Sequence, residues 1–177
     1  MSNDIVAAFK ALSLHGMAGA WPEMLGTART KSLDVETVMH QLLKAERAQR
    51  EVRSMAYQMR AARFPSHRDL AGFAFDQASV DEALVRELHQ MKFLDSAHNV
   101  VLVGGPGTGK THLATSLGIE AIREHGKRVR FFSTVELVNT LEQEKVQGKA
   151  GQMAHRLMYA DLVILDELGY LPFTQSG

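Results

Sequence analysis

The segment Gly104-Gly-Pro-Gly-Thr-Gly-Lys-Thr111 constrains the fold of this chain more than any other stretch. It fits the pattern G-x-x-x-x-G-K-[ST], in which glycines allow successive backbone N–H groups to turn inward around a phosphate. That interpretation requires a strand before the pattern and a helix after it. Here the apolar run Val100–Val103 predicts a buried parallel strand, and Lys110–Glu124 has a helical pattern that Gly126 ends. The segment is therefore predicted to be a phosphate-binding loop.

The chemistry of the loop assigns roles to individual side chains. Lys110 is expected to reach the β- and γ-phosphates of a nucleotide, and the Thr111 hydroxyl to ligate Mg²⁺. The helix that follows directs the positive end of its dipole at the same charge. His112 is counted with this segment, although its own role is expected to be structural. The predicted nucleotide-binding residues are Gly104, Gly105, Pro106, Gly107, Thr108, Gly109, Lys110, Thr111 and His112.

A second chemical signal lies downstream, where the apolar run Leu162–Leu165 ends in Asp166 and Glu167. A buried strand that ends in an acid delivers a carboxylate to the carboxyl edge of a parallel sheet, beside the phosphate loop. Asp166 is expected to hold Mg²⁺ through water, and Glu167 to polarise the attacking water. Glu167 and Lys110 are thus the predicted catalytic residues of nucleotide hydrolysis.

The remaining elements of this half complete an α/β pattern. A strand is expected at 128–133, a helix opened by a capping box at Ser133–Glu136 and ending near Val146, and a short helix at Gln152–Tyr159. Upstream, Ser66–Gln77 has the composition of an irregular linker, and a capping box at Ser79–Glu82 predicts a helix to about Met91. Alternating strands and helices predict a parallel sheet.

The front of the chain is predicted to be entirely helical, with helices at 3–14, 17–25 and about 33–62. Gly16 is expected to break the first helix from the second, and Ser32 to cap the third. Lys44, Arg47 and Arg50 lie one turn apart on one side of the third helix. Such a basic face could neutralise DNA phosphates. It is equally typical of a solvated helix surface.

Composition excludes several classes of protein. The chain has no Cys, so disulfide scaffolds and thiolate metal sites are excluded, and a reducing cytoplasm is the expected location. The sequence contains no run of about 18 apolar residues, so no membrane span is predicted. The eight His are scattered without ligand spacing, so zinc is not expected. Four apolar residues ahead of the loop are expected mostly to pack in the core: Phe73, Phe75, Phe93 and Leu94.

Two runs, GPGTGKTHLA (Gly105–Ala114) and YADLVILDELGYLPF (Tyr159–Phe173), resemble the IstB-like ATPases, the transposition helpers of bacterial insertion sequences. These belong to the AAA+ class and are related to DnaC-type helicase loaders. The stretches MAGAWPEML and LLKAERAQREVR are similar to the family's N-terminal domain, so the resemblance covers nearly the whole chain. It implies an ATP- and Mg²⁺-dependent ATPase that assembles as a homo-oligomer on double-stranded DNA, bends it and recruits a transposase. It also favours DNA as the partner of Lys44, Arg47 and Arg50.

On this basis we expect an α/β P-loop NTPase (AAA+) fold with an incomplete parallel sheet, preceded by a small all-α domain. Residues 1–65 would bind DNA or a partner, 66–98 would form a linker and adenine-side segment, and 99–177 a partial ATPase core from Walker A to Walker B. The family's strand order, 5-1-4-3-2, leaves a missing strand between the first and third predicted strands. The chain is therefore expected to be a fragment that binds ATP weakly and hydrolyses it poorly.

Alternative functions stay open at this point. A helicase loader would share the same fold and motifs. A non-enzymatic remnant would retain only the binding of DNA or of the parent ATPase by its helical front. A small-molecule kinase is disfavoured, because no segment resembles a substrate lid and Glu167 fits water activation better.

Overall fold

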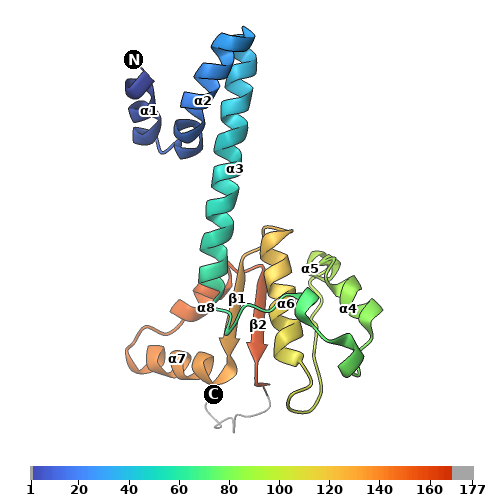
Figure 1. Cartoon of the computed structure of the whole chain (residues 1–177). Coiled ribbons are helices and arrows are strands. Elements are labelled where there is room, and N and C mark those ends of the chain that lie inside the picture. The colour runs from blue at the N-terminus through green and yellow to red at the C-terminus, as the bar shows by residue number, and fades with distance from the viewer. Residues whose placement is uncertain (1, 169–177) are drawn as a thin grey trace. The chain divides into compact units, whose positions relative to one another are not determined.

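The computed structural model describes residues 2–168, which fall into two compact units that divide between Ala56 and Tyr57. Helix α3 (Val35–Ala62) begins in the first unit and its last turns belong to the second (Figure 1). No helix in the described part of the chain is long and apolar enough to cross a membrane.

The first unit is built from α1 (Ser2–Ala11), α2 (His15–Lys31) and the start of α3. Helices α1 and α2 pack against each other, and the rings of Phe9 and Trp21 meet edge to face with centroids 5.9 Å apart. The apolar side chains that form the small core of this unit are Met17, Ala18 and Leu42.

Gly16 does not break the helix as predicted but lies in the first turn of α2. A glycine stands at this position because α3 approaches closely: a Cβ at position 16 would lie 2.5 Å from the carbonyl oxygen of Ala45. The buried Glu46 carboxylate accepts the N–H groups of Gly16 (2.7 Å) and Met17 (3.2 Å), which satisfies donors that the start of a helix leaves unpaired. The glycine is needed for packing between the helices.

The boundary between α2 and α3 also differs from the prediction. Helix α2 continues past Leu25 to Lys31, and Ser32 ends it in a left-handed conformation (φ 48°) instead of capping α3. Asp34 caps α3, since its carboxylate accepts hydrogen bonds from the N–H (2.7 Å) and the hydroxyl (2.9 Å) of Thr37. These bonds lower the pKa of Asp34.

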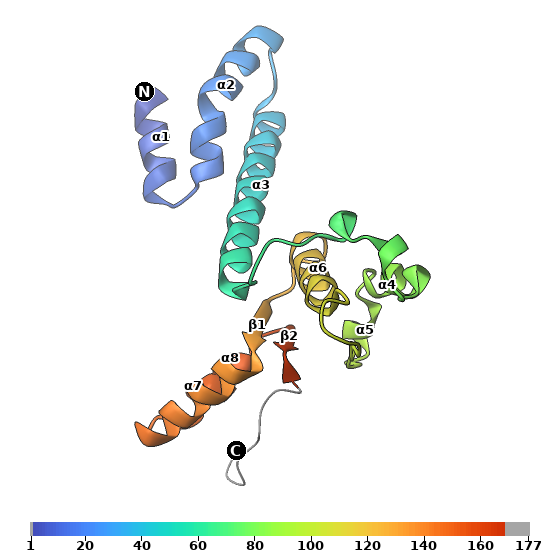
Figure 2. The same ribbon diagram turned by 60° about the horizontal axis from the view of Figure 1, so that its bottom comes forward.

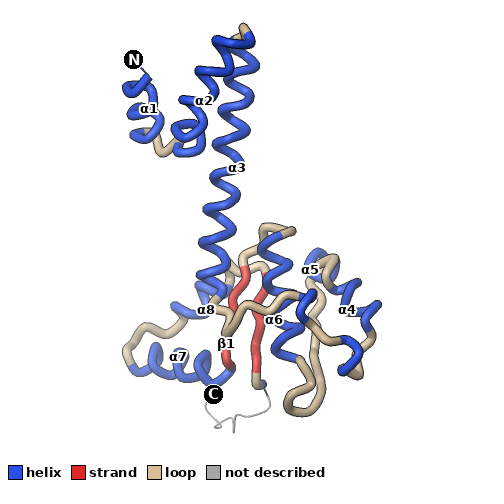
Figure 3. Tube along the Cα trace, viewed as in Figure 1, coloured by secondary structure: helices blue, strands red, loops and turns tan. Residues whose placement is uncertain are grey.

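The second unit is organised on a two-stranded parallel sheet of β1 (Val129–Ser133) and β2 (Leu162–Asp166). Val129 is paired with Leu162 and Ser133 with Asp166, so both strands end at one edge. Helix α6 (Lys110–Arg123) packs on this sheet, as Figures 1 and 3 show. The predicted parallel pairing of these two strands is confirmed.

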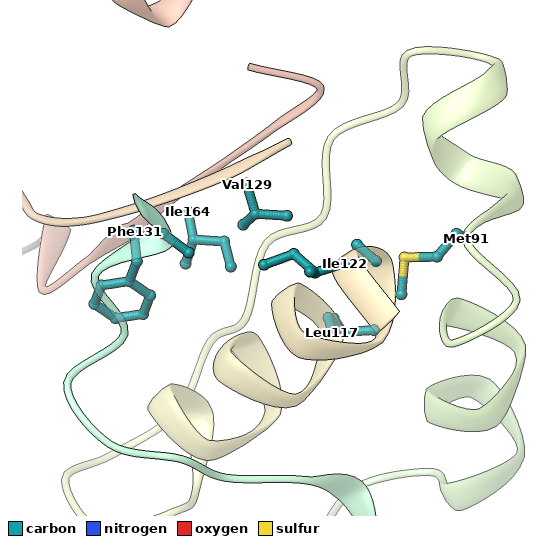
Figure 4. Packing of buried hydrophobic residues seen from close by; sticks show 8 residues of the cluster. Met91, Leu117, Ile122, Val129, Phe131 and Ile164 are labelled. Atoms are coloured by element: carbon teal, nitrogen blue, oxygen red, sulfur yellow. The ribbon is translucent and has the colours of Figure 1, made fainter. Parts of the chain in front are cut away.

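The core of the second unit lies between α6 and the sheet. Figure 4 shows Ile122 of α6 pointing toward Val129 and Ile164 of the two strands, and Leu117 of the same helix belongs to the same buried cluster. Gly118 permits this close approach, because a Cβ there would lie 2.8 Å from Cδ1 of Ile164 and 2.6 Å from the Phe64 ring. The buried cluster comprises Ala62, Met91, Leu117, Ala121, Ile122, Val129, Phe131 and Ile164.

Short helices surround this core, and Figure 2 shows them from a second direction. Ahead of the loop lie the 3₁₀ turns η1 (Leu70–Gly72) and η2 (Phe75–Gln77) and the helices α4 (Glu82–Leu88) and α5 (Lys92–Asp95). Between the strands lie α7 (Thr134–Val146) and α8 (Gln152–Leu157).

Both predicted capping boxes of this unit are wrong in detail. Helix α4 is capped by Asp81, whose carboxylate accepts the N–H groups of Ala83 (2.8 Å) and Leu84 (3.3 Å), so the helix starts after Asp81 and not after Ser79. Ser133 stands at the N-cap of α7 but its side chain makes no capping hydrogen bond. Helix α4 also ends at Leu88, before the predicted end near Met91, and a turn separates it from α5.

The predicted strand Val100–Val103 is wrong, because this segment is a loop. Val101 and Val103 are 78% and 91% exposed, although their sequence is that of a buried strand. A strand requires a hydrogen-bonded neighbour, and in residues 2–168 the sheet consists of β1 and β2 alone. Apolar, β-branched composition could therefore not produce a strand here.

Candidate nucleotide-binding site

The loop Gly104–Thr111 joins the extended segment before it to the N-terminus of α6. Gly107 and Gly109 have φ values of +74° and +88°, which side chains disfavour, and Gly109 is the N-cap of α6. The loop is mostly exposed, so its backbone N–H groups and the start of α6 are open to solvent and to an anion.

The side chain of Lys110 folds back onto the loop. Its ammonium donates hydrogen bonds to the carbonyl oxygens of Gly104 (2.8 Å) and Gly105 (2.6 Å). The Thr108 hydroxyl donates to the carbonyl oxygen of Gly105 (2.9 Å) from the other side. The loop thus holds the ammonium of Lys110 against its own backbone carbonyl oxygens.

Thr111 and Asp166 come together although 55 positions separate them in the chain. The Thr111 hydroxyl donates a hydrogen bond of 2.8 Å to Oδ2 of the carboxylate. The Thr134 hydroxyl donates to the carbonyl oxygen of Asp166 (2.7 Å), which fixes the end of β2 beside the start of α7. The two predicted magnesium ligands therefore lie side by side at the end of the sheet.

Glu167 follows Asp166 in a left-handed conformation with φ +62°, which is unfavourable for a residue with a side chain. Its N–H donates a hydrogen bond of 3.1 Å to Oδ1 of Asp166. Its own side chain is exposed. The turn thus orients the Asp166 carboxylate and leaves the Glu167 carboxylate accessible beside it. The GYLPF run that follows Leu168 lies outside the described residues.

The residues of the loop and strand end fit a nucleotide with Mg²⁺. A hydroxyl and a carboxylate are hard oxygen ligands, and Mg²⁺ is typically held by one or two such protein groups together with waters and phosphate oxygens. Among residues 2–168 there is no group of three or more His, Asp or Glu that could hold a metal alone. A metal at this site would accordingly require the phosphates.

An ion pair between Arg128 and Asp161 lies at the start of β1 and β2. The Arg128 guanidinium donates to both carboxylate oxygens of Asp161 (3.0 and 2.8 Å), and the Arg128 N–H adds a third bond of 2.7 Å. The hydrogen bonds from Arg128 lower the pKa of Asp161 from its ordinary value of 3.8 to about 2. This pair fixes where β1 and β2 begin and thereby the register that carries Asp166 to the site.

Some residues singled out in the sequence lie elsewhere. Phe93 and Leu94 pack against the core cluster, as expected for most of the apolar residues in this region. Phe73 and His112 instead meet at the start of α6, with ring centroids 5.2 Å apart. Their spacing in the sequence carries no signal of this contact, since Phe73 lies in an irregular segment.

The basic residues of α3 are largely engaged with acids of the same helix. Arg47 pairs with Glu51 (3.1 Å) and Arg50 with the buried Glu46 (2.7 Å). The hydrogen bond from Arg50 is the largest of the effects that lower the pKa of Glu46. Lys44 makes no ion pair within the described part of the chain.

Fold and site define a mixed α/β protein whose small parallel sheet and glycine loop are consistent with a P-loop NTPase domain. A family model described as "IstB-like ATP binding protein" matches residues 7–177. The chain belongs to this family.

Named relatives are proteins of insertion sequences. The putative ATP-binding protein of IS5376 from Geobacillus stearothermophilus is 35% identical over 90% of this chain and 64% of its own length. That of IS21 from Pseudomonas aeruginosa is 37% identical over 86% of this chain and 58% of its own length. The putative ATP-binding protein of IS232 from Bacillus thuringiensis subsp. berliner is 31% identical over 91% of this chain and 64% of its own length. The chain thus spans less than two thirds of each of these relatives.

Proposed function

We propose that this chain binds ATP with Mg²⁺ at the Gly104–Thr111 loop and serves the transposition of an insertion sequence. The hydrogen bond between Thr111 and Asp166 is the observation that carries the proposal, because it joins the hydroxyl of the loop to the acid of β2. The names of the relatives, which are putative ATP-binding proteins of insertion sequences, support the biological context.

Each residue of the site has a proposed task. The backbone N–H groups of residues 104–111 and the start of α6 bind the phosphates. Lys110 exchanges its two bonds to loop carbonyls for bonds to phosphate oxygens. Thr111 and Asp166 hold Mg²⁺, which when bound neutralises phosphate charge. Glu167, exposed beside Asp166, accepts a proton from water or orients it for hydrolysis.

The wider role rests on the family. We propose that residues 1–65 bind double-stranded DNA, that 66–98 form a linker and adenine-side segment, and that 99–177 belong to the ATPase core. A homo-oligomer on DNA would recruit the transposase. Lys44 is the best candidate for a DNA phosphate contact of the three basic residues on α3, because Arg47 and Arg50 are already paired with glutamates.

The first test is equilibrium binding of fluorescent ATP in the presence of Mg²⁺. Lys110→Ala removes a charged phosphate ligand and should weaken binding at least about tenfold. Lys149→Ala removes an exposed lysine from the loop after α7 and should bind as the unsubstituted chain does. Equal affinity of the Lys110 and Lys149 variants would refute the proposal.

The partner is tested separately. In affinity capture with the transposase of the same element and with a replicative helicase, we expect retention of the transposase only. Retention of the helicase alone would identify a helicase loader. DNA binding by α3 predicts that Lys44→Ala weakens the complex and reduces its dependence on salt.

A further inference from the structure

The phosphate loop is covered at one point by an aromatic ring from the segment ahead of it. A Cβ built on Gly109 would lie 2.6 Å from Cε2 and 3.1 Å from Cζ of Phe73. The ring thus lies directly against the backbone of the residue that caps α6. Because Gly109 also has φ +88°, the position is restricted both by its own backbone and by Phe73.

His112 holds this ring in place from the other side. The edge of one ring meets the face of the other at 85°, with centroids 5.2 Å apart. The His112 Nε2 is 2.8 Å from the carbonyl oxygen of Asp69. Since a carbonyl only accepts hydrogen bonds, Nε2 carries the hydrogen and donates it. One side chain of α6 therefore makes both an aromatic and a polar contact with the segment 69–73.

The segment that carries Phe73 is itself ordered by short-range bonds. The Asp69 carboxylate accepts the N–H of Gly72 (3.1 Å), which fixes the turn η1, and η1 packs against α6. The Phe73 ring also contacts the Phe75 ring, with centroids 4.9 Å apart, and the guanidinium of Arg86 lies 5.7 Å from the centre of the Phe75 ring. A continuous set of contacts thus connects α4, both 3₁₀ turns and the start of α6.

We propose that His112 and Phe73 are positioning residues that hold the segment 69–77 against the phosphate loop and fix Gly109 in its left-handed conformation. Loss of the contact would free both the segment and the loop, so that the loop N–H groups would lose their common orientation. The inference rests on the proposed function only for its effect on ATP. Its structural part, the coupling of the two segments, is independent of nucleotide.

The structural part is tested by amide hydrogen exchange of the full chain without nucleotide. His112→Ala removes the hydrogen bond and the ring contact together, so exchange should rise about tenfold in residues 69–77 and at Leu113, whose N–H donates to the carbonyl oxygen of Gly109 (2.9 Å). His112→Gln retains an N–H donor near the position of Nε2 and should restore part of the protection. Phe73→Leu should reproduce the effect of His112→Ala. His125→Gln, at an exposed histidine beyond the end of α6, is the matched control and should change exchange at neither place.

The outcomes separate the inference from the proposed function. A rise only in residues 69–77 or only at Leu113, in neither, or equally throughout the second unit would overturn the inference. ATP affinity is measured on the same variants, and His112→Ala should lower it about tenfold with partial recovery in His112→Gln. If the unsubstituted chain binds no ATP, the proposed function fails while the exchange result still decides the coupling. If Lys110→Ala abolishes binding and His112→Ala leaves it unchanged, the inference fails alone.

Discussion

Substitution of Gly16 by alanine should destabilise the first unit, although alanine is the better helix former. The added Cβ would lie 2.5 Å from the carbonyl oxygen of Ala45 and 2.6 Å from Cα of Glu46. Both are backbone atoms, so a change of side-chain rotamer cannot relieve the overlap, and α2 must move away from α3. Such overpacking costs about 3 kcal/mol at the upper end of its usual range.

The gain in helix propensity offsets part of this cost. Replacing glycine by alanine within a helix stabilises it by about 1 kcal/mol, which leaves a net loss of about 2 kcal/mol. Movement of α2 would also lengthen the bonds from Gly16 and Met17 to the Glu46 carboxylate, which acts in the same direction. For a unit of this size the expected fall in melting temperature is about 10 °C.

Trp21 provides the assay, because it is the single tryptophan of the chain and packs on Phe9 within the first unit. Its fluorescence during urea unfolding reports on this unit. Gly19→Ala is the matched control in the same helix, since a Cβ there meets nothing within 4 Å, and it should stabilise the unit by up to about 1 kcal/mol. A Gly16→Ala variant as stable as Gly19→Ala would refute the conclusion that contact between α2 and α3 excludes a side chain at position 16.

Two further predictions concern the second unit. Glu167→Gly should raise the free energy of unfolding by about 1 kcal/mol, because it relieves a left-handed φ of +62°, and on the proposed role of Glu167 it should abolish whatever ATP hydrolysis the unsubstituted chain shows. An unchanged free energy of unfolding would contradict the backbone strain at this position. The pKa of Asp161 is lowered to about 2 from 3.8, so the stability that its pair with Arg128 contributes is present above about pH 4 and is lost as pH falls toward 2. Asp161→Asn should therefore flatten the loss of stability across that window in acid unfolding, and an unchanged acid profile would refute this assignment.

The sequence predicted the proximity of Thr111 and Asp166 but not the extent of the sheet. The loop motif at the start of a helix and the acid at the end of an apolar strand together predicted that Thr111 and Asp166 would meet, because nucleotide-binding groups gather at the carboxyl edge of a parallel sheet. Val100–Val103 failed because a strand depends on a neighbour that composition does not reveal. The break expected at Gly16 failed for a related reason, since the glycine serves the contact with Ala45 in another helix.

Other features of the site could not be predicted because they depend on contacts that the motifs do not specify. In the structure Lys110 donates hydrogen bonds to the carbonyl oxygens of Gly104 and Gly105, whereas the motif predicts only a contact with phosphate. The contact between Phe73 and His112 joins a helix to an irregular segment. The pairing of Arg50 with Glu46 is visible as an i, i+4 spacing, but the burial of Glu46 against α2 is not.

The most direct test of the account is the Mg²⁺ dependence of ATP binding, measured by calorimetry on the full chain. Mg²⁺ should tighten binding in the unsubstituted chain and in Thr111→Ser, which keeps the hydroxyl. Thr111→Val and Asp166→Asn should each lose that enhancement while retaining the affinity measured without the metal, because the loop and Lys110 remain. Equal enhancement by Mg²⁺ in all four proteins would contradict the assignment of Thr111 and Asp166 as the magnesium ligands.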